Sequence, residues 1–315
     1  MSNISEAANF LKSRDNIEIY SHIHPDGDTT GSSFALCSAL LKLGKKARVV
    51  CLDSFPESFS YIHSLEMPDF EPETTVSVDV ATRSLLGKEF PENKQIHLAI
   101  DHHLNNTTEA DIIVCDPTRS AAGELVYELI CALGVELDRY IAEAIYTAIS
   151  TDTGCFRFSN TNRQTFEIAG RLCDFAEGGS FGYLNTPLFI TKSQEQLRLE
   201  ANILANLDYF YDGRVCISVI SSTLFDSLGV SENDAAGIEQ IAKVPKGVEL
   251  GITLKERLGG YKVSMRSSDS VDASAICAYF GGGGHHSASG CFIKGTKDEV
   301  LDEILEYIEE SNLFI

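Results

Sequence analysis

Basic residues are scarce in this chain. Its 315 residues include 25 Lys and Arg against 46 Asp and Glu, for a formal net charge of −21 at pH 7. Broad binding to nucleic acid or to an anionic membrane requires a basic surface, so the composition argues against both. It does not exclude a nucleotide substrate held by a few local cations or metal ions. A metal site lined with carboxylates would itself add to the negative charge.

Paired cysteines and long apolar runs are also missing. The nine cysteines form no C-x-x-C pair, and most lie within apolar stretches, as Cys37 and Cys277 do. This pattern is typical of buried thiols in a reducing compartment. No apolar run approaches the ~18 residues of a membrane helix, and the first residues lack a basic segment followed by an apolar one. We therefore expect a cytoplasmic protein that does not bind membranes.

The first half of the chain alternates strand-like and helix-like segments. The predicted strands are 17–22, 47–52, 75–80, 96–101 and 111–116, and the predicted helices are 33–44, 120–133, 138–151 and 163–176. The polar stretch "IHPDGDTTGS" before the first of these helices is predicted to be a loop. Such alternation predicts an α/β domain with a mostly parallel sheet covered on both faces. In sheets of this kind, the loops at the carboxyl ends of the strands build the site.

A second, smaller α/β domain is predicted after a polar stretch. Residues 191–213 have little strand character, and we interpret them as a connector helix between domains at 1–190 and 214–315. The elements predicted beyond the connector are strands at 214–220, 248–254 and 260–267, helices near 221–242, at 272–280 and at 297–311, and a glycine loop and short strand before the last helix. We expect a cleft between the two domains.

Carboxylate and imidazole groups follow the strands and one helix of the first domain. These candidates are His22, Asp26, Asp28, Asp79, Asp101, His102, His103 and Asp152. Although they are far apart in the sequence, the carboxyl ends of neighbouring parallel strands share one edge of the sheet, so the groups can converge there. Carboxylates brought together repel one another and raise each other's pKa unless cations compensate. The sequence therefore predicts a metal site.

The donor types indicate which metals would bind. Carboxylate and imidazole without thiolate favour Mn²⁺, Mg²⁺ or Zn²⁺ over the metals of a cysteine site. The candidate ligands are too many for one catalytic ion with open positions. They suit two ions roughly 3.5–4 Å apart, the arrangement found in phosphoryl hydrolysis.

Each motif also has a purely structural interpretation. Asp26 and Asp28 beside a glycine are typical of a turn, and Asp79 could cap a helix. The acid and two imidazoles from Asp101 onward could form a hydrogen-bonded cluster, and Asp152 could end a helix. All four motifs occur in order, each at the end of a predicted element, and together they favour the metal site.

Four motifs in the first half resemble those of the DHH phosphoesterase superfamily. They are "HIHPDGD", "VSVDV", "AIDHHLNN" and "AISTDTGCFRFSNT". The C-terminal "FGGGGHHSASG" is similar to the glycine-rich signature of the DHH-associated domain, and the resemblance spans nearly the whole chain. The compact two-domain form is most similar to enzymes that degrade very short RNA oligomers and dephosphorylate 3'-phosphoadenosine 5'-phosphate (pAp).

The resemblance implies roles for the first-domain candidates. One manganese ion is expected on His22 and Asp26 and the other on Asp28, with Asp79 as the bridging carboxylate. His102 and Asp152 match further ligands, and Asp152 is expected to be shared. Asp101 is expected to orient a histidine, and His103 is expected to lie near the scissile phosphate or to support the metal ligands. His24 falls where the family pattern varies and is left out of the ligand set.

The resemblance places substrate binding in the second domain. Gly282, Gly283 and Gly284 are expected to let the backbone approach a phosphate closely. His285 matches the signature histidine, and Arg266 is a candidate for a bidentate phosphate contact. A flexible turn and an exposed arginine are the structural alternatives. The sequence does not indicate whether His286, next to His285, takes part.

The predicted activity is phosphoester hydrolysis with two divalent ions, Mn²⁺ first and Mg²⁺ as the alternative. The predicted substrates are short single-stranded RNA, cleaved to mononucleotides, and pAp, converted to AMP; no long basic track is apparent. One rival is a phosphodiesterase for pApA or cyclic di-AMP, and a rival of another class is a non-catalytic nucleotide sensor. The oligomeric state, a homodimer included, stays open.

Overall fold

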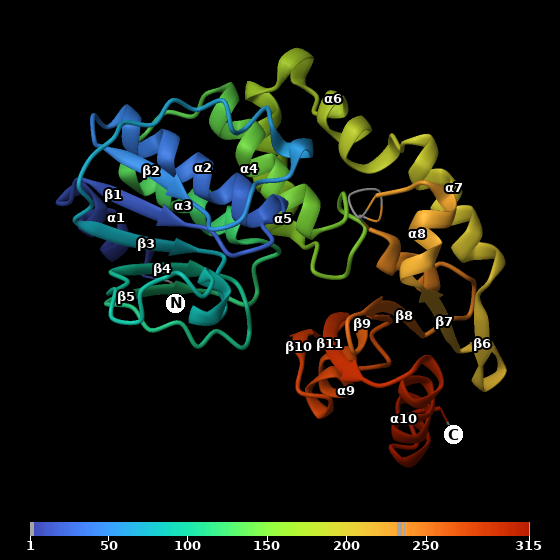
Figure 1. The fold of residues 1–315 in the computed structure, drawn as a ribbon. Coiled ribbons are helices and arrows are strands. Elements are labelled where there is room, and N and C mark those ends of the chain that lie inside the picture. The colour runs from blue at the N-terminus through green and yellow to red at the C-terminus, as the bar shows by residue number, and fades with distance from the viewer. Residues whose placement is uncertain (1–2, 232–234, 236, 315) are drawn as a thin grey trace. The chain divides into compact units, whose positions relative to one another are not determined.

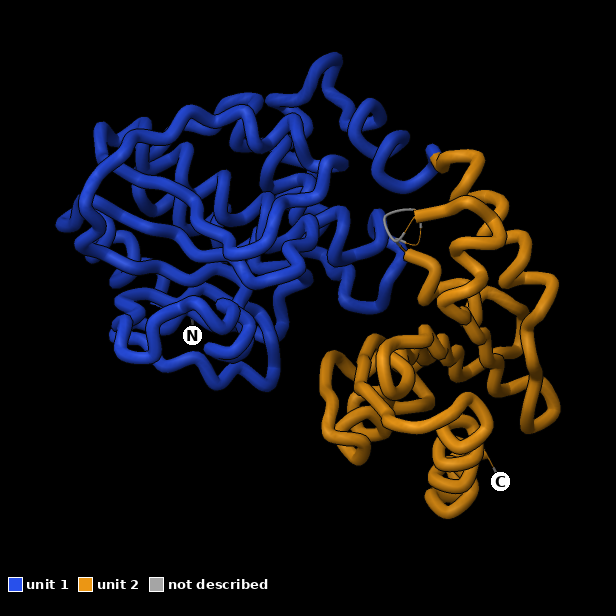
Figure 2. Tube along the Cα trace, viewed as in Figure 1, with its two compact units in different colours: residues 1–191 blue, residues 192–315 orange. Residues whose placement is uncertain are grey.

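The computed structural model describes residues 3–231, 235 and 237–314. The chain divides into two compact units, residues 1–191 and residues 192–315, each with a sheet and a core of its own (Figure 2). Among the described residues, no helix is both long enough and apolar enough to cross a bilayer.

The sheet of the first unit is parallel throughout. Its strands lie in the order β2-β1-β3-β4-β5 (Figure 1). They are β1 Ile17–Tyr20, β2 Ala47–Val50, β3 Thr74–Val78, β4 Leu98–Asp101 and β5 Ile112–Cys115. Each lies within a predicted strand or starts one residue before it, so the predicted α/β class is confirmed. Because all five run in the same direction, their carboxyl ends share one edge.

Helices cover one face of this sheet. Ile17 and Ile19 of β1 and Val76 and Val78 of β3 belong to the same buried cluster as the apolar residues of the helices. These helices are α1 Ile4–Lys12, α2 Gly27–Lys42, α3 Ala122–Leu133, α4 Arg139–Asp152 and α5 Arg163–Leu172. Of these, α1 was not predicted.

The opposite face carries an irregular cover in place of a long helix. Since side chains alternate along a strand, Glu18 and Tyr20 point away from the helical core. Tyr20 packs with Phe90 and other apolar residues of segment 80–97, which contains the short helix η2 Arg83–Leu86. The buried Glu18 carboxylate pairs with Arg48 and Lys94, at 2.6 Å each. A buried carboxylate is thus compensated by two cations.

Helix α2 begins six residues before its predicted start at residue 33. The prediction of a loop over "IHPDGDTTGS" is wrong from Gly27 onward. The reason is the cap: one Asp26 carboxylate oxygen accepts the backbone N–H groups of Asp28 and Thr29, at 3.0 and 3.1 Å. Capping of these N–H groups allows a helix to start in a sequence of small polar residues.

Helices α2 and α4 pack with almost no space between them. A Cβ atom added at Gly31 would lie 2.2 Å from the carbonyl oxygen of Ala144 and 2.9 Å from the backbone nitrogen of Ala148. A Cβ atom at Gly27 would similarly meet Thr151. These glycines let the amino-terminal end of α2 lie against the carboxyl-terminal end of α4, which carries Asp152.

The second unit has a mixed sheet in the order β10-β11-β9-β8-β7-β6. Its strands are β6 Asp208–Phe210, β7 Val215–Ile220, β8 Leu250–Arg257, β9 Gly260–Ser267, β10 Gly283–His285 and β11 Ala288–Lys294. Among the described residues of this sheet, β7 and β8 pair in parallel and the other neighbouring strands pair antiparallel. Its helices are α7 Gln194–Ala205, α8 Ser222–Leu228, η8 Ile238–Lys243, α9 Ala273–Tyr279 and α10 Lys297–Glu310.

Two predictions about the second unit need correction, and part of a third lies outside the described residues. The stretch 191–213 contains the helix α7, but it also contains the edge strand β6, so its interpretation as one helix is wrong at its end. The glycine stretch is partly the strand β10 of a hairpin. Within the helical stretch expected near 221–242, residues 232–234 and 236 lie outside the described residues.

Candidate metal centre

Eight acidic and imidazole side chains of the first unit come from one edge of its sheet and the adjoining end of α4. His22 follows β1, Asp79 follows β3, Asp101 ends β4, and Asp152 ends α4. His102 and His103 continue from β4, and Asp26 and Asp28 lie at the start of α2. The parallel arrangement thus brings together residues separated by 130 positions in the chain, from 22 to 152.

A first group is formed by His22, Asp26 and Asp79. The Nε2 atom of His22 lies 3.7 Å from a carboxylate oxygen of Asp26 and 3.6 Å from Oδ2 of Asp79. One ligand atom of each residue lies within 4.8 Å of the others, which is close enough for the three to hold one ion.

A second group is formed by Asp28, Asp79, His102 and Asp152. The Nε2 atom of His102 lies 3.6 Å from Oδ2 of Asp28, 3.6 Å from Oδ1 of Asp79 and 3.3 Å from Oδ2 of Asp152. Asp28, Asp79 and His102 likewise satisfy the 4.8 Å grouping. Both groups draw on Asp79, one through each of its carboxylate oxygens.

Asp79 has an unusual backbone conformation and a buried side chain. Its φ angle is +60°, a left-handed conformation that Asp and Asn adopt more readily than most residues. Its side chain is only 3% exposed, and Oδ1 has no hydrogen-bond partner among the described residues. A buried carboxylate oxygen without a partner is costly, which is the condition that a bound cation relieves.

Asp28 is held by the amino-terminal end of α3. Its carboxylate accepts the backbone N–H groups of Ala122 and Gly123, at 2.6 and 3.0 Å, and the hydroxyl of Ser32, at 2.8 Å. The partial positive charge at a helix N-terminus stabilises an anion there. The carboxylate is thereby fixed in position while it is completely buried.

Backbone carbonyls orient two of the imidazoles. The Nδ1 atom of His102 lies 3.2 Å from the carbonyl oxygen of Arg119, and the Nδ1 atom of His22 lies 2.8 Å from that of Ile23. A carbonyl can only accept, so each Nδ1 carries a proton, and Nε2 is the nitrogen that faces the carboxylates and can bind a metal once its own proton is displaced. This is the usual arrangement for a histidine that binds a metal.

Asp101 and His103 form a separate pair beside the second group. One Asp101 oxygen accepts from the backbone N–H of His102 at 2.9 Å and from Nδ1 of His103 at 2.8 Å. The other oxygen accepts from the side chain of Asn106. Because both oxygens already have donors, Asp101 is placed to orient the histidines, although it also lies within ligand distance of Asp79 and His103.

Burial and repulsion perturb the ionisation of this cluster. Burial raises the pKa of Asp28 well above its ordinary value, and the charges of Asp79 and Asp152 raise it further. Burial also raises the pKa of Asp79. Burial lowers the pKa of His22, but its interactions with Asp26 and Asp79 outweigh that effect and raise the pKa to about 11. A divalent cation would therefore displace protons from this cluster.

Several residues that hold the site were not among the sequence candidates. Asn106 fixes Asp101, Arg119 orients His102, and the N-terminus of α3 holds Asp28. Arg119 is itself anchored by ion pairs to Asp116, at 3.0 Å, and to Glu128, at 2.8 Å. The sequence signal for Asn106 was its place three residues after the triplet's last histidine, in "HHLNN". The other two act through backbone atoms, which no side-chain pattern reveals.

His24 lies outside both groups. Its side chain is 88% exposed, and its Nδ1 atom lies 3.1 Å from the carboxylate of Asp53. The backbone N–H of His24 donates to the same carboxylate, at 2.8 Å.

The remaining predicted site residues lie in the second unit. Arg266 of β9 donates from Nη1 to the carbonyl of Met265 at 2.9 Å and has no carboxylate within ion-pair distance among the described residues. Burial lowers its pKa. Gly282 and Gly284 are required by the hairpin itself, since an added Cβ would lie 2.2 Å from the Gly290 carbonyl oxygen and 2.6 Å from that of Ala288 respectively. Of the three predicted glycines, Gly283 alone has open space around it, and the nearby His285 and His286 are exposed.

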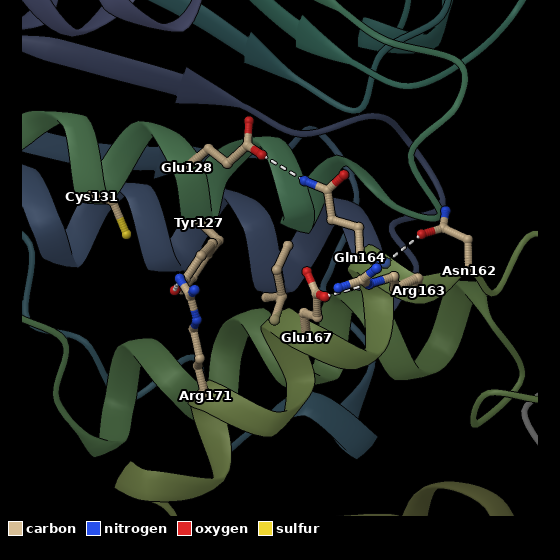
Figure 3. A pocket seen from close by; sticks show the side chains of 9 residues that line it. Tyr127, Glu128, Cys131, Asn162, Arg163, Gln164, Glu167 and Arg171 are labelled. Carbon is tan, nitrogen blue, oxygen red and sulfur yellow. Dashed lines mark hydrogen bonds and ion pairs between the residues drawn. The ribbon is translucent and has the colours of Figure 1, made fainter.

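A large pocket of the first unit lies away from these side chains. It has a volume of about 660 Å³ and lies between α3 and α5 (Figure 3). Its lining includes Tyr127, Glu128, Arg163, Gln164 and Arg171. None of the metal-binding candidates lines this pocket, so it is separate from the candidate metal centre.

Comparison with known proteins identifies both units. A family model described as "DHH family, N-terminal domain" matches residues 16–149, and one described as "DHHA1 domain" matches residues 214–311. The bifunctional oligoribonuclease and PAP phosphatase NrnA of Thermus thermophilus is 32% identical over 93% of this chain and 89% of its own. The protein of the same name from Bacillus subtilis is 27% identical over 94% of each chain. The crystal structure of an exopolyphosphatase-related protein from Bacteroides fragilis superimposes with a TM-score of 0.87, at 26% identity, over 98% of this chain and 96% of its own.

Proposed function

The chain belongs to the DHH family, and from this premise we propose that it is a metal-dependent phosphoesterase acting on short RNA and pAp. It hydrolyses short RNA oligonucleotides to mononucleotides and dephosphorylates pAp to AMP. The relatives named as bifunctional oligoribonuclease and PAP phosphatase match this chain over nearly its whole length. The observation that carries the proposal is the position of Asp79 between two groups of ligands.

The proposed ligands of the first ion are His22, Asp26 and Asp79. The proposed ligands of the second ion are Asp28, Asp79, His102 and Asp152. The buried Oδ1 of Asp79, which has no hydrogen-bond partner among the described residues, and the raised pKa values of Asp28 and Asp79 support this assignment, because both features are relieved by a cation.

Mn²⁺ is the ion that the donors favour. Carboxylate oxygens suit both Mg²⁺ and Mn²⁺, but Mg²⁺ is usually bound through oxygen ligands and retained water. An imidazole in each group, His22 and His102, therefore favours Mn²⁺. When bound, two such cations supply water activation and neutralise charge on the phosphoryl oxygens.

The chain's own residues orient and protonate the reactants. Burial lowers the pKa of His103, but its bond to Asp101 and the nearby charges outweigh burial and raise that pKa. A raised pKa favours the protonated imidazole, which suits His103 to contact the scissile phosphate or its leaving oxygen as a hydrogen-bond donor. Asp101 acts through His103 as a positioning residue, held in turn by Asn106.

The second unit supplies the proposed phosphate contacts. Arg266 has no carboxylate partner among the described residues, and its guanidinium can hold a phosphate through two hydrogen bonds. The exposed backbone at Gly283 and the imidazole of His285 are the other proposed contacts, with Gly282 and Gly284 shaping the hairpin that presents them.

Rate measurements with Mn²⁺ test the proposal. The substrates are pAp, an RNA dinucleotide, a long RNA, pApA and cyclic di-AMP, and the enzymes are wild type and Asp79→Asn. Asp111→Asn is the control, because that exposed carboxylate contacts only the side chain of Gln95 among the described residues. We expect hydrolysis of pAp and the dinucleotide that Asp79→Asn loses and Asp111→Asn keeps.

Two other outcomes reject the proposal. Hydrolysis confined to pApA or cyclic di-AMP would assign the chain to dinucleotide signalling. Tight binding of these nucleotides without any hydrolysis would identify it as a sensor.

A further inference from the structure

The segment after Asp152 has an unusual backbone. Three consecutive residues, Gly154, Cys155 and Phe156, have positive φ angles of +54°, +59° and +63°. Two of them carry a side chain, for which this conformation is strained. Strain of this kind persists only where the surroundings enforce it, and it is concentrated at functional sites.

The surroundings of this turn enforce it through Thr153, which is completely buried. The carbonyl of Thr153 accepts from the backbone N–H groups of Arg157 and Phe158, at 2.9 and 3.0 Å. Its hydroxyl accepts from the N–H of Phe156 at 3.0 Å. The turn is thus closed by three hydrogen bonds to one residue, next to the proposed ligand Asp152.

The far end of the segment is fastened to the same site. The side chain of Asn160 donates to the carbonyl of Asp152 at 3.1 Å and to that of Ser120 at 3.0 Å. Ser120 lies just before the N-terminus of α3, whose backbone N–H groups hold Asp28. The segment 153–160 is therefore tied to the elements that carry two proposed ligands of the second ion.

Two phenylalanines of this segment have different environments. Phe156 packs inward, with its ring centroid 5.9 Å from that of Tyr146 and 5.6 Å from that of Phe166. Phe158 belongs to no core cluster and is 39% exposed, and its ring has no aromatic or cationic partner among the described residues. The turn therefore buries the ring of Phe156 and leaves the ring of Phe158 partly exposed to solvent.

Gly154 sets the position of the Phe158 ring. A Cβ atom added there would lie 2.3 to 2.6 Å from Cζ, Cε1 and Cε2 of Phe158. These distances place the added atom over one face of the ring, near Cζ, so the glycine backbone covers that face and a base would stack on the opposite face. The side chain of Arg157 also donates to the carbonyl of Gly154.

We infer that Phe158 is the stacking platform for a nucleobase of the substrate, and that it makes the enzyme prefer nucleotides over phosphate esters that lack a base. The inference rests on the proposed function. In a nucleotide, one sugar separates the base from the phosphate, so a residue that stacks on the base should lie beside the metal ligands. Segment 153–160 lies there, because Asn160 is hydrogen-bonded to Asp152 and Ser120. Stacking on an aromatic ring tolerates any base, as an enzyme for short RNA of varied sequence requires.

The test compares pAp with its counterpart that lacks adenine, ribose 3',5'-bisphosphate. Phe158→Leu should lower the ratio of kcat/KM for pAp to kcat/KM for ribose 3',5'-bisphosphate roughly tenfold, the effect of losing one stacked base. Phe158→Tyr should restore the ratio. Gly154→Ala, which displaces the ring, should lower it as Phe158→Leu does.

Phe175→Leu is the matched control, since Phe175 is 37% exposed and has no ring contact among the described residues. Its ratio should equal that of wild type. A ratio in Phe158→Leu within twofold of wild type, or an equal loss on both substrates, overturns the inference while leaving the proposed function intact. If wild type hydrolysed neither substrate, both the inference and the proposed function would be rejected.

Discussion

Replacement of Asp79 by Asn should have opposite consequences with and without metal. Asn tolerates the left-handed backbone at this position and has nearly the same volume, so the fold should accept it. In the metal-free protein, burial disfavours the ionised carboxylate, as the raised pKa of Asp79 indicates. A group whose native pKa is raised destabilises the fold as pH increases through that pKa. At neutral pH, the metal-free variant should therefore be as stable as wild type or more stable.

The loss should occur when metal is added. At a Mn²⁺ concentration about 100 times Kd, one bound ion stabilises the native state by about 2.7 kcal/mol, and two ions by about 5 kcal/mol. For a unit of 191 residues, each kcal/mol raises Tm by roughly 2–4 °C. Wild type should thus gain roughly 10–20 °C. Asp79→Asn weakens both groups, so most of this gain should disappear.

Calorimetric melting of chelator-treated protein with increasing Mn²⁺ measures both effects. Asp111→Asn, which alters an exposed carboxylate away from the ligands, should show the full wild-type gain. If Asp79→Asn kept the full Mn²⁺-dependent gain, the bridging role would be refuted. If the metal-free variant melted far below wild type, the reasoning about the buried charge would be wrong.

Three further predictions concern other parts of the molecule. Burial raises the pKa of Glu18, but its hydrogen bonds to Lys94, Arg48 and Tyr20 outweigh burial and lower that pKa below 4.5. The stabilisation by ionised Glu18 should be complete above about pH 4.5 and be lost as pH falls through the lowered pKa. The free energy of unfolding of Glu18→Gln should therefore depend less on pH in acid than that of wild type. Gly31→Ala should destabilise the metal-free protein by about 1–3 kcal/mol or more in urea, because the added methyl meets the backbone of α4; unchanged stability would contradict that packing. Arg266→Lys should raise KM for pAp roughly tenfold, since lysine cannot make the bidentate contact, while Mn²⁺ affinity measured by titration calorimetry stays unchanged; a change in that affinity would contradict the assignment.

Much of the fold could be predicted because local patterns and burial agree along the chain. Short runs of β-formers separated by helical segments led to all five strands of the first sheet. The prediction failed for α1, which is short, and for the start of α2. There the small polar residues resembled a loop, and the Asp26 cap together with the close contact at Gly31 made a helix.

The glycines of the C-terminal signature show a different limit of sequence reasoning. Their run was interpreted as a loop open to phosphate, but Gly282 and Gly284 are required by the close approach of β11. Gly281 and Gly283 have the open space that the interpretation assumed. A glycine needed for a ligand and a glycine needed for a neighbouring strand look the same in a sequence.

By itself, the sequence determined which chemical groups are available and that parallel strands bring them to one edge. Carboxylates and imidazoles at the ends of β1, β3, β4 and α4 were sufficient to predict a metal site. The motif resemblance had implied that Asp79 is shared, but only the tertiary structure decided which contacts hold the groups in place. Asp79 lies between His22 and His102, Asp28 is held by backbone N–H groups of α3, and His102 is oriented by the carbonyl of Arg119. Such contacts depend on distances of a few ångströms and on backbone atoms that every residue carries, so no pattern of side chains along the chain encodes them.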